Sequence, residues 1–259
     1  MHCMTFDIET IPDTDSGRLL YGLDGLSDED VYKAMAFKRQ QKTGSDFMPL
    51  HLQRIVAISV ALRTGNEFRV WTLGSESSDE AELIRRFFDG VERYVPDLVS
   101  WNGSGFDLPV LHYRALKHGI DAHRYWDTGD DNREFRFNNY LGRFHWRHID
   151  VMDVLAGYQP RGRAPLDEIA VMLGFPGKLG MSGSKVFDTW LAGDLARIRN
   201  YCETDVLNTY LVYLRFEAMR GHLDADGLAR EEALVRDMLG QSDAPHLHEY
   251  LAAWPAANG

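Results

Sequence analysis

Apolar and polar residues alternate at the start of the chain. Within Met4–Thr10, the apolar Phe6 and Ile8 alternate with the acidic Asp7 and Glu9. A period of two residues is typical of a β-strand, in which successive side chains point to opposite faces. The pattern therefore predicts a strand that carries two carboxylates on one face and apolar side chains on the other.

Two further runs rich in apolar residues follow, at 54–62 and 67–73. Thr64-Gly65-Asn66 separates them, and its Gly-Asn pair is a hairpin signal. Together with the first strand, these runs predict a meander of three antiparallel strands. The intervening residues 13–50 follow a proline that breaks regular structure, and we interpret them as an insertion that contains one helix.

The remainder of the chain alternates short strands with helices. The segment 78–94 has an apolar stripe at helical spacing, and Ser78 is expected as its N-cap. The strand expected at 97–101 leads into a helix through a glycine-bearing turn. The predicted helices are 27–42, 78–94, 108–118, 166–173, 193–219 and 222–239, with a strand entering a helix within 147–153 and a tail after 239.

The composition fits one large domain with an appendage. Of the 259 residues, 44% are hydrophobic and 12% are aromatic, which is ample for a core. The longest apolar run, 55–62, is far too short to span a bilayer, so we expect no membrane partner. Because the sequence begins directly with the first strand, it leaves no room for a signal peptide, and we expect a cytoplasmic protein.

Charge and cysteine content narrow the function classes. The 39 acidic and 28 basic residues give a net charge of −11. This charge argues against a protein that coats nucleic acid non-specifically, because neutralising phosphates requires Lys and Arg, but it allows an enzyme that holds one strand end. Cys3 and Cys202 are the only cysteines. Neither has a partner at metal-ligand spacing, so we expect neither a zinc site nor a disulfide framework.

Asp7 and Glu9 are the first candidates for chemistry. Two neighbouring carboxylates on a short apolar strand lose hydration and repel each other. A divalent cation between them would remove both costs. Taken alone, the pair is better explained by a strand face that is open to water, and two later segments change that interpretation.

The two later segments carry polar residues where elements meet. Asn102-Gly103-Ser104-Gly105-Phe106-Asp107 lies between a strand and a helix, where α/β sheets place their sites, and a simple N-cap role for Asp107 stays open. Tyr201 and Asp205 are four residues apart and share a helical face, either in a site or as a buried hydrogen-bonded pair. The three segments offer four carboxylates and one phenol, which suit magnesium or manganese.

Other charged segments leave two interpretations each. Residues 121–148 interleave aromatic residues with arginine, which can stack bases and hold phosphates, and an ordinary surface loop explains them equally well. The basic, glycine-rich residues 177–185 form either a contact to a nucleic-acid backbone or only a loop. Asp150 and Asp153 are further carboxylates by type. We interpret Asp153 as structural and leave Asp150 open.

The three chemical segments occur in an order and at a spacing that resemble those of a known family. Asp-x-Glu within 6–10, Asn-x3-Phe-Asp at 102–107 and Tyr-x3-Asp at 201–205 resemble the motifs of the DEDDy branch of the DEDD exonucleases, which have a DnaQ-like, RNase H-like fold. Within this branch, the chain looks most like the exonuclease domain of family B DNA polymerases, and in particular a stand-alone predicted 3′-5′ exonuclease family. The resemblance covers about residues 4–216.

The resemblance implies a fold and a domain organisation. The fold class is α/β, with an RNase H-like mixed five-stranded sheet flanked by helices. An exonuclease domain would span 1–220, with an insertion at about 13–50, and a helical extension and tail would span 221–259. The resemblance includes no polymerase module.

For the site, the resemblance implies two divalent metal ions, Mg²⁺ or Mn²⁺. Asp7 would bridge both ions. Glu9 and Asp205 would complete the site of the ion that activates water, and Asp107 would hold the ion beside the leaving 3′ oxygen.

The resemblance also implies contacts to water and substrate. Tyr201 would hydrogen-bond the attacking water and set its direction, and Thr10, Asn102 and Phe106 would contact the terminal nucleotides. The expected partner is the 3′ end of single-stranded nucleic acid, DNA rather than RNA, hydrolysed to nucleoside monophosphates. A 3′-5′ exoribonuclease of the same superfamily and a non-catalytic nucleic-acid-binding module on the same fold are the alternatives.

Overall fold

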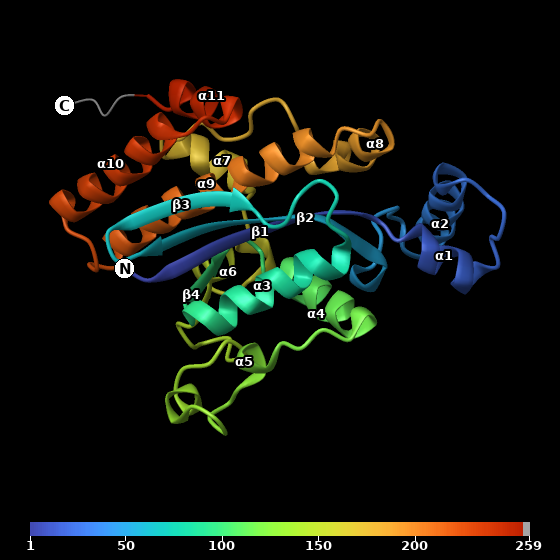
Figure 1. The fold of residues 1–259 in the computed structure, drawn as a ribbon, viewed down its shortest axis with the longest axis horizontal. Helices are drawn as coiled ribbons and strands as arrows, with labels where there is room; N and C mark the ends of the chain where they lie inside the picture. The colour runs from blue at the N-terminus through green and yellow to red at the C-terminus, as the bar shows by residue number, and fades with distance from the viewer. Residues whose placement is uncertain (256–259) are drawn as a thin grey trace.

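A computed structural model describes residues 1–255 as a mixed five-stranded sheet between helices (Figure 1). The strand order is β3-β2-β1-β4-β5. β2 pairs antiparallel with both β1 and β3, whereas β4 lies parallel to β1 and to β5. The predicted fold class and antiparallel meander are therefore confirmed. The strands are β1 Cys3–Pro12, β2 Gln53–Thr64, β3 Glu67–Thr72, β4 Asp97–Ser100 and β5 His148–Asp150.

Helices cover both faces of the sheet. The long helix α9 (Leu195–Met219) lies along one face and carries α7, α10 and α11 on its outer side, whereas α3 and α4 cover the opposite face (Figure 1). The other α-helices are α1 Thr14–Tyr21, α2 Asp28–Thr43, α3 Glu80–Tyr94, α4 Asp107–His118, α5 His123–Trp126, α6 Val151–Leu155, α7 Leu166–Met172, α8 Val186–Leu191, α10 Ala225–Gln241 and α11 Pro245–Ala253. None of them, within the residues described, is long and apolar enough to cross a membrane.

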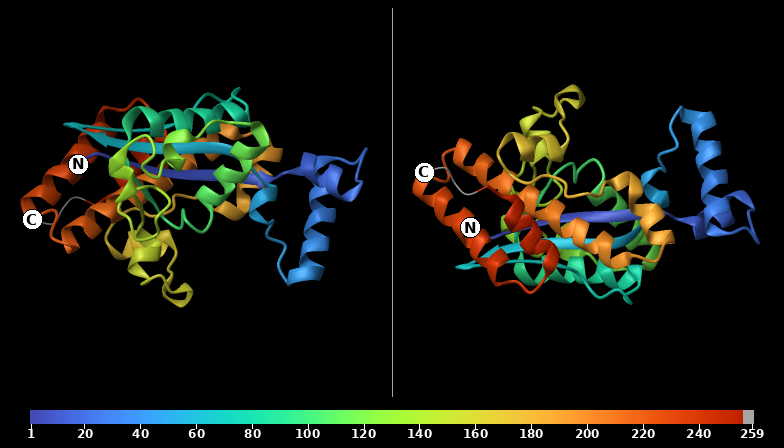
Figure 2. Two further views of the ribbon diagram at one scale, coloured as in Figure 1. Left: turned by 90° about the horizontal axis from the view of Figure 1, so that it is seen from below. Right: turned by 90° about the horizontal axis from the view of Figure 1, so that it is seen from above.

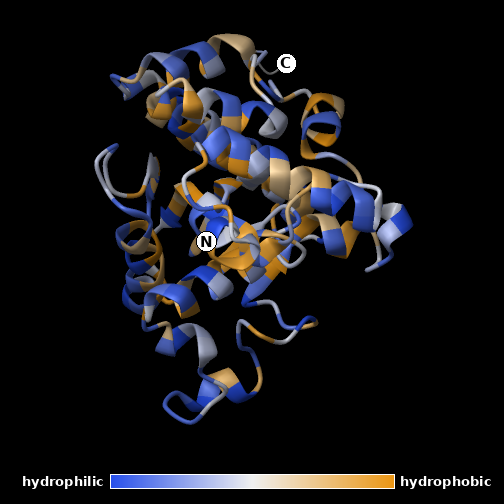
Figure 3. Ribbon diagram, turned by 90° about the vertical axis from the view of Figure 1, so that its right-hand side faces the viewer, coloured by the Kyte–Doolittle hydropathy of each residue, from blue (hydrophilic) through white to orange (hydrophobic). Residues whose placement is uncertain are grey.

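The alternation predicted for the first strand is present in β1. Phe6 and Ile8 are buried with the apolar side chains of α3 and α4, and the rings of Phe6 and Phe87 lie 5.1 Å apart. Asp7 and Glu9 lie on the other face, beneath α9. Figure 3 shows apolar residues gathered at the centre of the molecule and many polar residues on its outlying helices and loops. β1 thus points apolar side chains towards α3 and α4 and its two carboxylates towards α9.

The N-cap predicted for α3 is wrong by one residue. The helix begins at Glu80, and the carboxylate of Asp79 accepts the capping hydrogen bond from the Glu82 backbone N–H at 2.8 Å. The hydroxyl of Ser78 instead accepts from Ser75 N at 3.0 Å. Both serine and aspartate are good caps, so the local sequence does not decide between them.

The tail predicted after residue 239 is partly helical. Residues 245–253 form α11, whose Leu247 and Tyr250 are buried against the core around α9. Residues 256–259 of the predicted tail lie outside the described part of the chain. The predicted boundary at residue 220 stays a prediction.

The expected insertion at 13–50 contains α1 as well as the predicted helix, and both project beyond the end of the sheet at which β1 ends (Figure 2). Its start is anchored by a buried ion cluster. The guanidinium of Arg114 on α4 pairs with Asp13 and with Glu80, and its Nε donates to Glu80 Oε1 at 2.7 Å. All three side chains are buried. The insertion is therefore held firmly where it leaves β1.

Candidate active site

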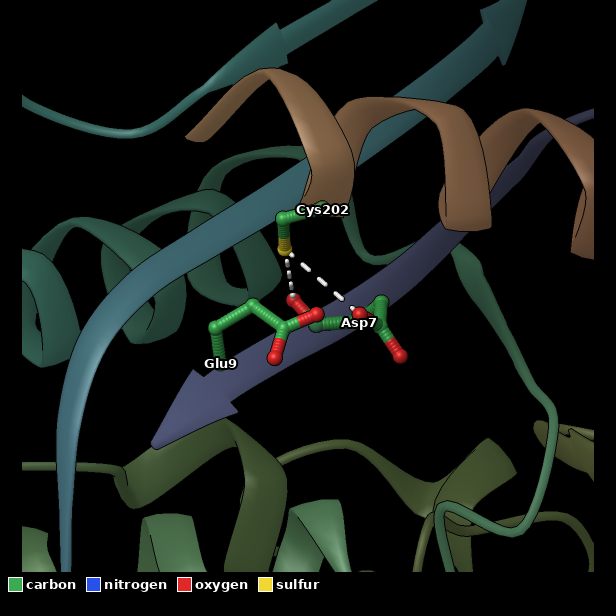
Figure 4. Close-up of side chains that lie close together, drawn as sticks. All are labelled: Asp7, Glu9 and Cys202. Carbon is green, nitrogen blue, oxygen red and sulfur yellow. Dashed lines mark hydrogen bonds between the residues drawn. The ribbon is translucent and has the colours of Figure 1, made fainter. Parts of the chain in front are cut away.

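The last residues of β1 place two carboxylates under α9. Glu9 is buried and Asp7 half-buried, and a β-bulge follows Glu9. Cys202 of α9 lies opposite: its Sγ is 3.5 Å from Asp7 Oδ2 and 3.4 Å from the Asp7 carbonyl oxygen. Ligand atoms of Asp7, Glu9 and Cys202 all lie within 4.8 Å of one another (Figure 4).

The turn after β4 is built by Asn102 and two glycines. Asn102 has φ 66°, a left-handed conformation that asparagine tolerates. A β-carbon on Gly103 or Gly105 would lie 2.2 Å or 2.5 Å from neighbouring side-chain oxygens. Asp150 Oδ1 accepts from Asn102 N at 3.0 Å, and its Oδ2 accepts from Ser104 N at 2.9 Å. Asp150, left open by the sequence, therefore braces this turn.

The same turn delivers Asp107 to the site. Asp107 is the first residue of α4, and Phe106 occupies the N-cap position without a side-chain cap bond. The Asp107 carboxylate reaches across to β1, where its Oδ1 accepts from Ile8 N at 3.1 Å. The alternative of a simple N-cap is therefore wrong, because the side chain joins α4 to the strand that carries Asp7 and Glu9.

Helix α9 supplies Tyr201 and Asp205. Both residues are buried, and they lie close enough for each to change the other's pKa. Asp205 Oδ1 is buried without a hydrogen-bond partner among residues 1–255. A hydrogen bond from Tyr201 acts to lower the pKa of Asp205, so the interpretation as a buried hydrogen-bonded pair stays open, with one carboxylate oxygen left for a further ligand.

The pKa shifts of the carboxyl groups reflect how closely β1, the start of α4 and α9 approach one another. Burial raises the pKa of Asp7 well above its usual value, and the charges of Asp107, Glu9 and Asp205 raise it further. Burial also raises the pKa of Glu9, and the charges of Asp205 and Asp107 raise it further. Burial raises the pKa of Asp107 to about 7 and that of Asp205 to about 6. The four carboxyl groups thus lie together in one poorly solvated site.

This donor set fits divalent cations. Asp205 Oδ1 has no partner among the described residues, and the crowded carboxylates are destabilised when they are ionised without a counter-charge. Carboxylate oxygens are the ligands that Mg²⁺ and Mn²⁺ prefer. The residues present are therefore suited to hold such ions.

Lys178 lies at the site, although the sequence did not show whether its loop has a functional role. It follows α7 in the glycine-rich loop, and its ammonium lies 5.7 Å from the centre of the Tyr201 ring. Its charge lowers the pKa of both Glu9 and Asp205. The basic composition of the loop was the only signal in the sequence.

Cys202 is a second residue that the sequence did not assign to the site. Burial, followed by the charge of Asp7, raises the pKa of the Cys202 thiol well above its usual value. The thiol is therefore neutral and donates to Asp7. Its position between Tyr201 and Asp205 in the third motif was the available signal.

The three residues predicted to contact substrate differ in what they offer. Thr10 donates its hydroxyl to Gln53 Oε1 at 3.0 Å. Asn102 Oδ1 is buried without a hydrogen-bond partner among the described residues. The half-buried ring of Phe106 lies 6.0 Å from that of Phe47, a largely exposed residue of the insertion that the sequence gave no reason to place here. The substrate contacts stay predictions.

Comparison with known proteins matches residues 45–254 to a family described as predicted 3′-5′ exonuclease related to the exonuclease domain of PolB. The matched range includes Asp107, Tyr201 and Asp205. It begins after β1, so Asp7 and Glu9 lie outside it.

Curated DNA polymerases match at modest identity. A DNA polymerase of Archaeoglobus fulgidus is 25% identical over 158 residues, which are 60% of this chain and 19% of that protein. The DNA polymerase epsilon catalytic chain of Dictyostelium discoideum is 27% identical over 141 residues, 53% of this chain and 6% of that protein. The chain thus spans at most about a fifth of the length of these relatives.

Exonuclease domains of this type act on nucleic acids and use divalent metal ions. The family match covers most of the chain, and the sheet order and acidic site agree with it. The chain belongs to the family of predicted 3′-5′ exonucleases related to the exonuclease domain of PolB.

Proposed function

We propose that the protein is a metal-dependent 3′-5′ exonuclease that hydrolyses single-stranded DNA ends to nucleoside monophosphates with two ions of Mg²⁺ or Mn²⁺. The observation that carries the proposal is the convergence of Asp7, Glu9, Asp107 and Asp205 from β1, α4 and α9. Burial raises the pKa of all four carboxyl groups, and the charges of neighbouring carboxylates raise the pKa of Asp7 and Glu9 further. Such a cluster is costly to the fold unless cations bind it.

The roles proposed for the residues are those that the family resemblance implies. Asp7 would be shared by both ions, Glu9 and Asp205 would hold one, and Asp107 would hold the other. When bound, the ions supply Lewis acidity to the scissile phosphate and lower the pKa of the attacking water.

Tyr201 would orient the attacking water. Burial raises the pKa of its phenol, and the charges of Asp205 and Glu9 raise it further, so the group stays protonated at neutral pH. It is therefore suited to hydrogen bonding and not to proton abstraction. Lys178, whose ammonium lies near this ring, carries a positive charge that complements a substrate phosphate.

DNA is proposed over RNA because the matched relatives are named DNA polymerases. An exoribonuclease differs in its contacts near the sugar 2′ position. A non-catalytic binding module would need no cluster of four carboxylates. Such a cluster repels the phosphates of a nucleic acid unless cations neutralise it.

The test is digestion of a 5′-labelled single-stranded DNA oligonucleotide with added Mg²⁺ or Mn²⁺, resolved on a sequencing gel. We expect a ladder that shortens from the 3′ end. It should be absent with a chelator and in Asp7→Ala, and kept in Asp24→Ala, which removes an exposed carboxylate of the insertion as a matched control.

Each other outcome points to one alternative. Faster digestion of a matched RNA strand would support the exoribonuclease. Binding of both strands with no cleavage of either would support the binding module. Full activity in Asp7→Ala would overturn the metal assignment.

A further inference from the structure

A cavity of about 630 Å³ lies beside the candidate site. It is bounded by α4, α5, the segment 140–146, α6 and Arg163. Ser104 and Gly105 form part of its rim, two to three residues before Asp107. Because the Asp150 carboxylate lines the cavity and also binds the backbone of this turn, the cavity and the site share a wall.

Aromatic side chains line this cavity and remain open to solvent. Trp126, Phe144 and Trp146 are 51%, 74% and 45% exposed. The ring of His112 lies 4.8 Å from that of Trp126. Three large exposed aromatic residues around one cavity differ from the scattered apolar residues that any surface carries. We call this feature the aromatic cavity; it is defined by His112, Trp126, Arg143, Phe144, Trp146 and Arg163.

Two arginines line the cavity and have N–H groups that make no hydrogen bond to residues 1–255. Arg163 donates to Asp153 Oδ1 at 2.8 Å, and Arg143 lies 3.4 Å from Asp153 Oδ2. Asp153 is therefore structural, as the sequence indicated. A guanidinium carries five N–H donors, and neither Nε nor Nη1 of either arginine has a partner among residues 1–255. These donors can bind a phosphate without breaking the ion pairs.

His112 adds a neutral polar group. Its Nε2 is buried without a hydrogen-bond partner among the described residues. Burial lowers the pKa of its imidazole to about 4, so the ring is uncharged at neutral pH. This uncharged ring adds no positive charge to the cavity, so the phosphate contacts fall to Arg143 and Arg163.

We propose that the aromatic cavity binds one nucleotide of the single strand, upstream of the nucleotide that is removed, with its base against Phe144, the most exposed of the three aromatic residues, and its phosphate at Arg143 and Arg163. The ligand class is an aromatic heterocycle joined to a phosphodiester. A cavity of this size is in the range that holds a small organic group. The assignment rests on the proposed function only for the direction of the strand.

The test uses fluorescence anisotropy to measure how tightly the full chain binds 5′-fluorescein oligothymidylates of increasing length. A chelator is present, so that no strand is cleaved. Affinity is expected to rise at the length that first reaches the cavity. Phe144→Ala and Arg163→Gln should both remove that rise. Phe144→Ala should weaken long strands about 5- to 160-fold, the range expected for the loss of one stacked base.

The matched controls are an aromatic residue and an arginine that do not line the cavity. Phe137→Ala truncates a residue that is 84% exposed and does not line the cavity. Arg161→Gln removes an exposed arginine two residues from Arg163. Both controls should bind as the parent does, and thermal melts should show that all four variants are folded.

The outcomes separate this inference from the proposed function. Equal affinities for Phe144→Ala, Arg163→Gln and their controls would overturn the inference, even if digestion of DNA succeeds. Tight binding of free thymidine monophosphate with no dependence on length would replace the strand by a free nucleotide and overturn it too. Loss of the length-dependent rise in a protein without nuclease activity would support the cavity and reject the exonuclease.

Discussion

The backbone N–H of Ile8 donates a hydrogen bond to Asp107 Oδ1 at 3.1 Å, across 99 residues of the chain. Ile8 lies between Asp7 and Glu9, so this bond holds the first residue of α4 against the strand that carries the other two carboxylates. The bond needs only an oxygen acceptor. The negative charge of Asp107 is therefore separable from its structural role.

Asp107→Asn is expected to abolish activity and to stabilise the metal-free protein at neutral pH. The asparagine oxygen still accepts from Ile8, but the buried charge is gone. The pKa of Asp107 is raised to about 7, so the folded state binds the proton more tightly than the unfolded state, and stability is lost as pH rises from about 4 towards 7. Above that range the charge costs about 1–4 kcal/mol.

Urea unfolding in chelator, measured at acid and at slightly alkaline pH, checks this expectation. The loss of stability with rising pH should be smaller in Asp107→Asn than in the parent. Asp24→Asn, on the exposed insertion, should keep the parental pH dependence. An unchanged pH dependence in Asp107→Asn would contradict the buried-charge argument.

Tyr201→Phe is expected to slow hydrolysis about 100-fold while metal affinity is kept, since one orienting hydrogen bond is lost and no carboxylate is removed. Because the pKa of the phenol is raised, its ionisation should contribute no limb to the pH–rate profile near neutrality. Steady-state rates across pH and metal titration by calorimetry measure both effects. Loss of metal affinity in this variant would show that the phenol does more than orient water.

The elements that were predictable are those whose pattern is local. The alternation around Phe6 and Ile8 gave β1 its correct faces, and the Gly65-Asn66 pair marked the turn between β2 and β3. Leu207 and Leu211 repeat at helical spacing and are fully buried in α9. In each case neighbouring residues carry the whole signal.

What was not predictable depends on contacts between distant segments. Lys178 reaches the site only because its loop packs beside α9, and Phe47 meets Phe106 only after the chain has folded. Asp150 caps α6 locally by accepting from Asp153 N at 3.2 Å, but its carboxylate also accepts from backbone groups 46 and 48 residues away, and that second role has no local signal. A spacing pattern along the chain contains no information on such partners.

Arg114→Met is expected to destabilise the fold by about 3–5 kcal/mol, because it leaves the carboxylates of Asp13 and Glu80 buried with fewer partners. Lys117 and His118 contact the same carboxylates but are more exposed and cannot replace the guanidinium. Urea unfolding gives the change in the free energy of unfolding.

Arg86→Met is the matched control for this change. Its pair with Glu82 on α3 is exposed to solvent, so it should contribute little to stability. Similar losses in both variants would show that the buried cluster is not what anchors the insertion.

Tyr250→Phe tests a hydrogen-bonded connection between α11 and the loop of Lys178. The Tyr250 hydroxyl donates to Asn208 Oδ1 at 2.7 Å, and Asn208 Nδ2 donates to the carbonyl oxygen of Gly177 at 2.9 Å. Removing the hydroxyl leaves a buried acceptor unsatisfied, so we expect a loss of about 1–3 kcal/mol in the free energy of unfolding.

The same variant is expected to lower the rate of hydrolysis with little change in metal affinity, because Gly177 sets the position of Lys178 and none of the four carboxylates. The backbone N–H of Lys178 also donates to Asp167 Oδ1 at 2.6 Å, so α7 and α9 both hold this part of the loop. Tyr113→Phe removes a hydroxyl from a half-exposed residue of α4 and should leave both rate and stability unchanged. A rate in Tyr250→Phe that equals the parent's, alongside the expected loss of stability, would mean that α11 supports the fold but does not position Lys178.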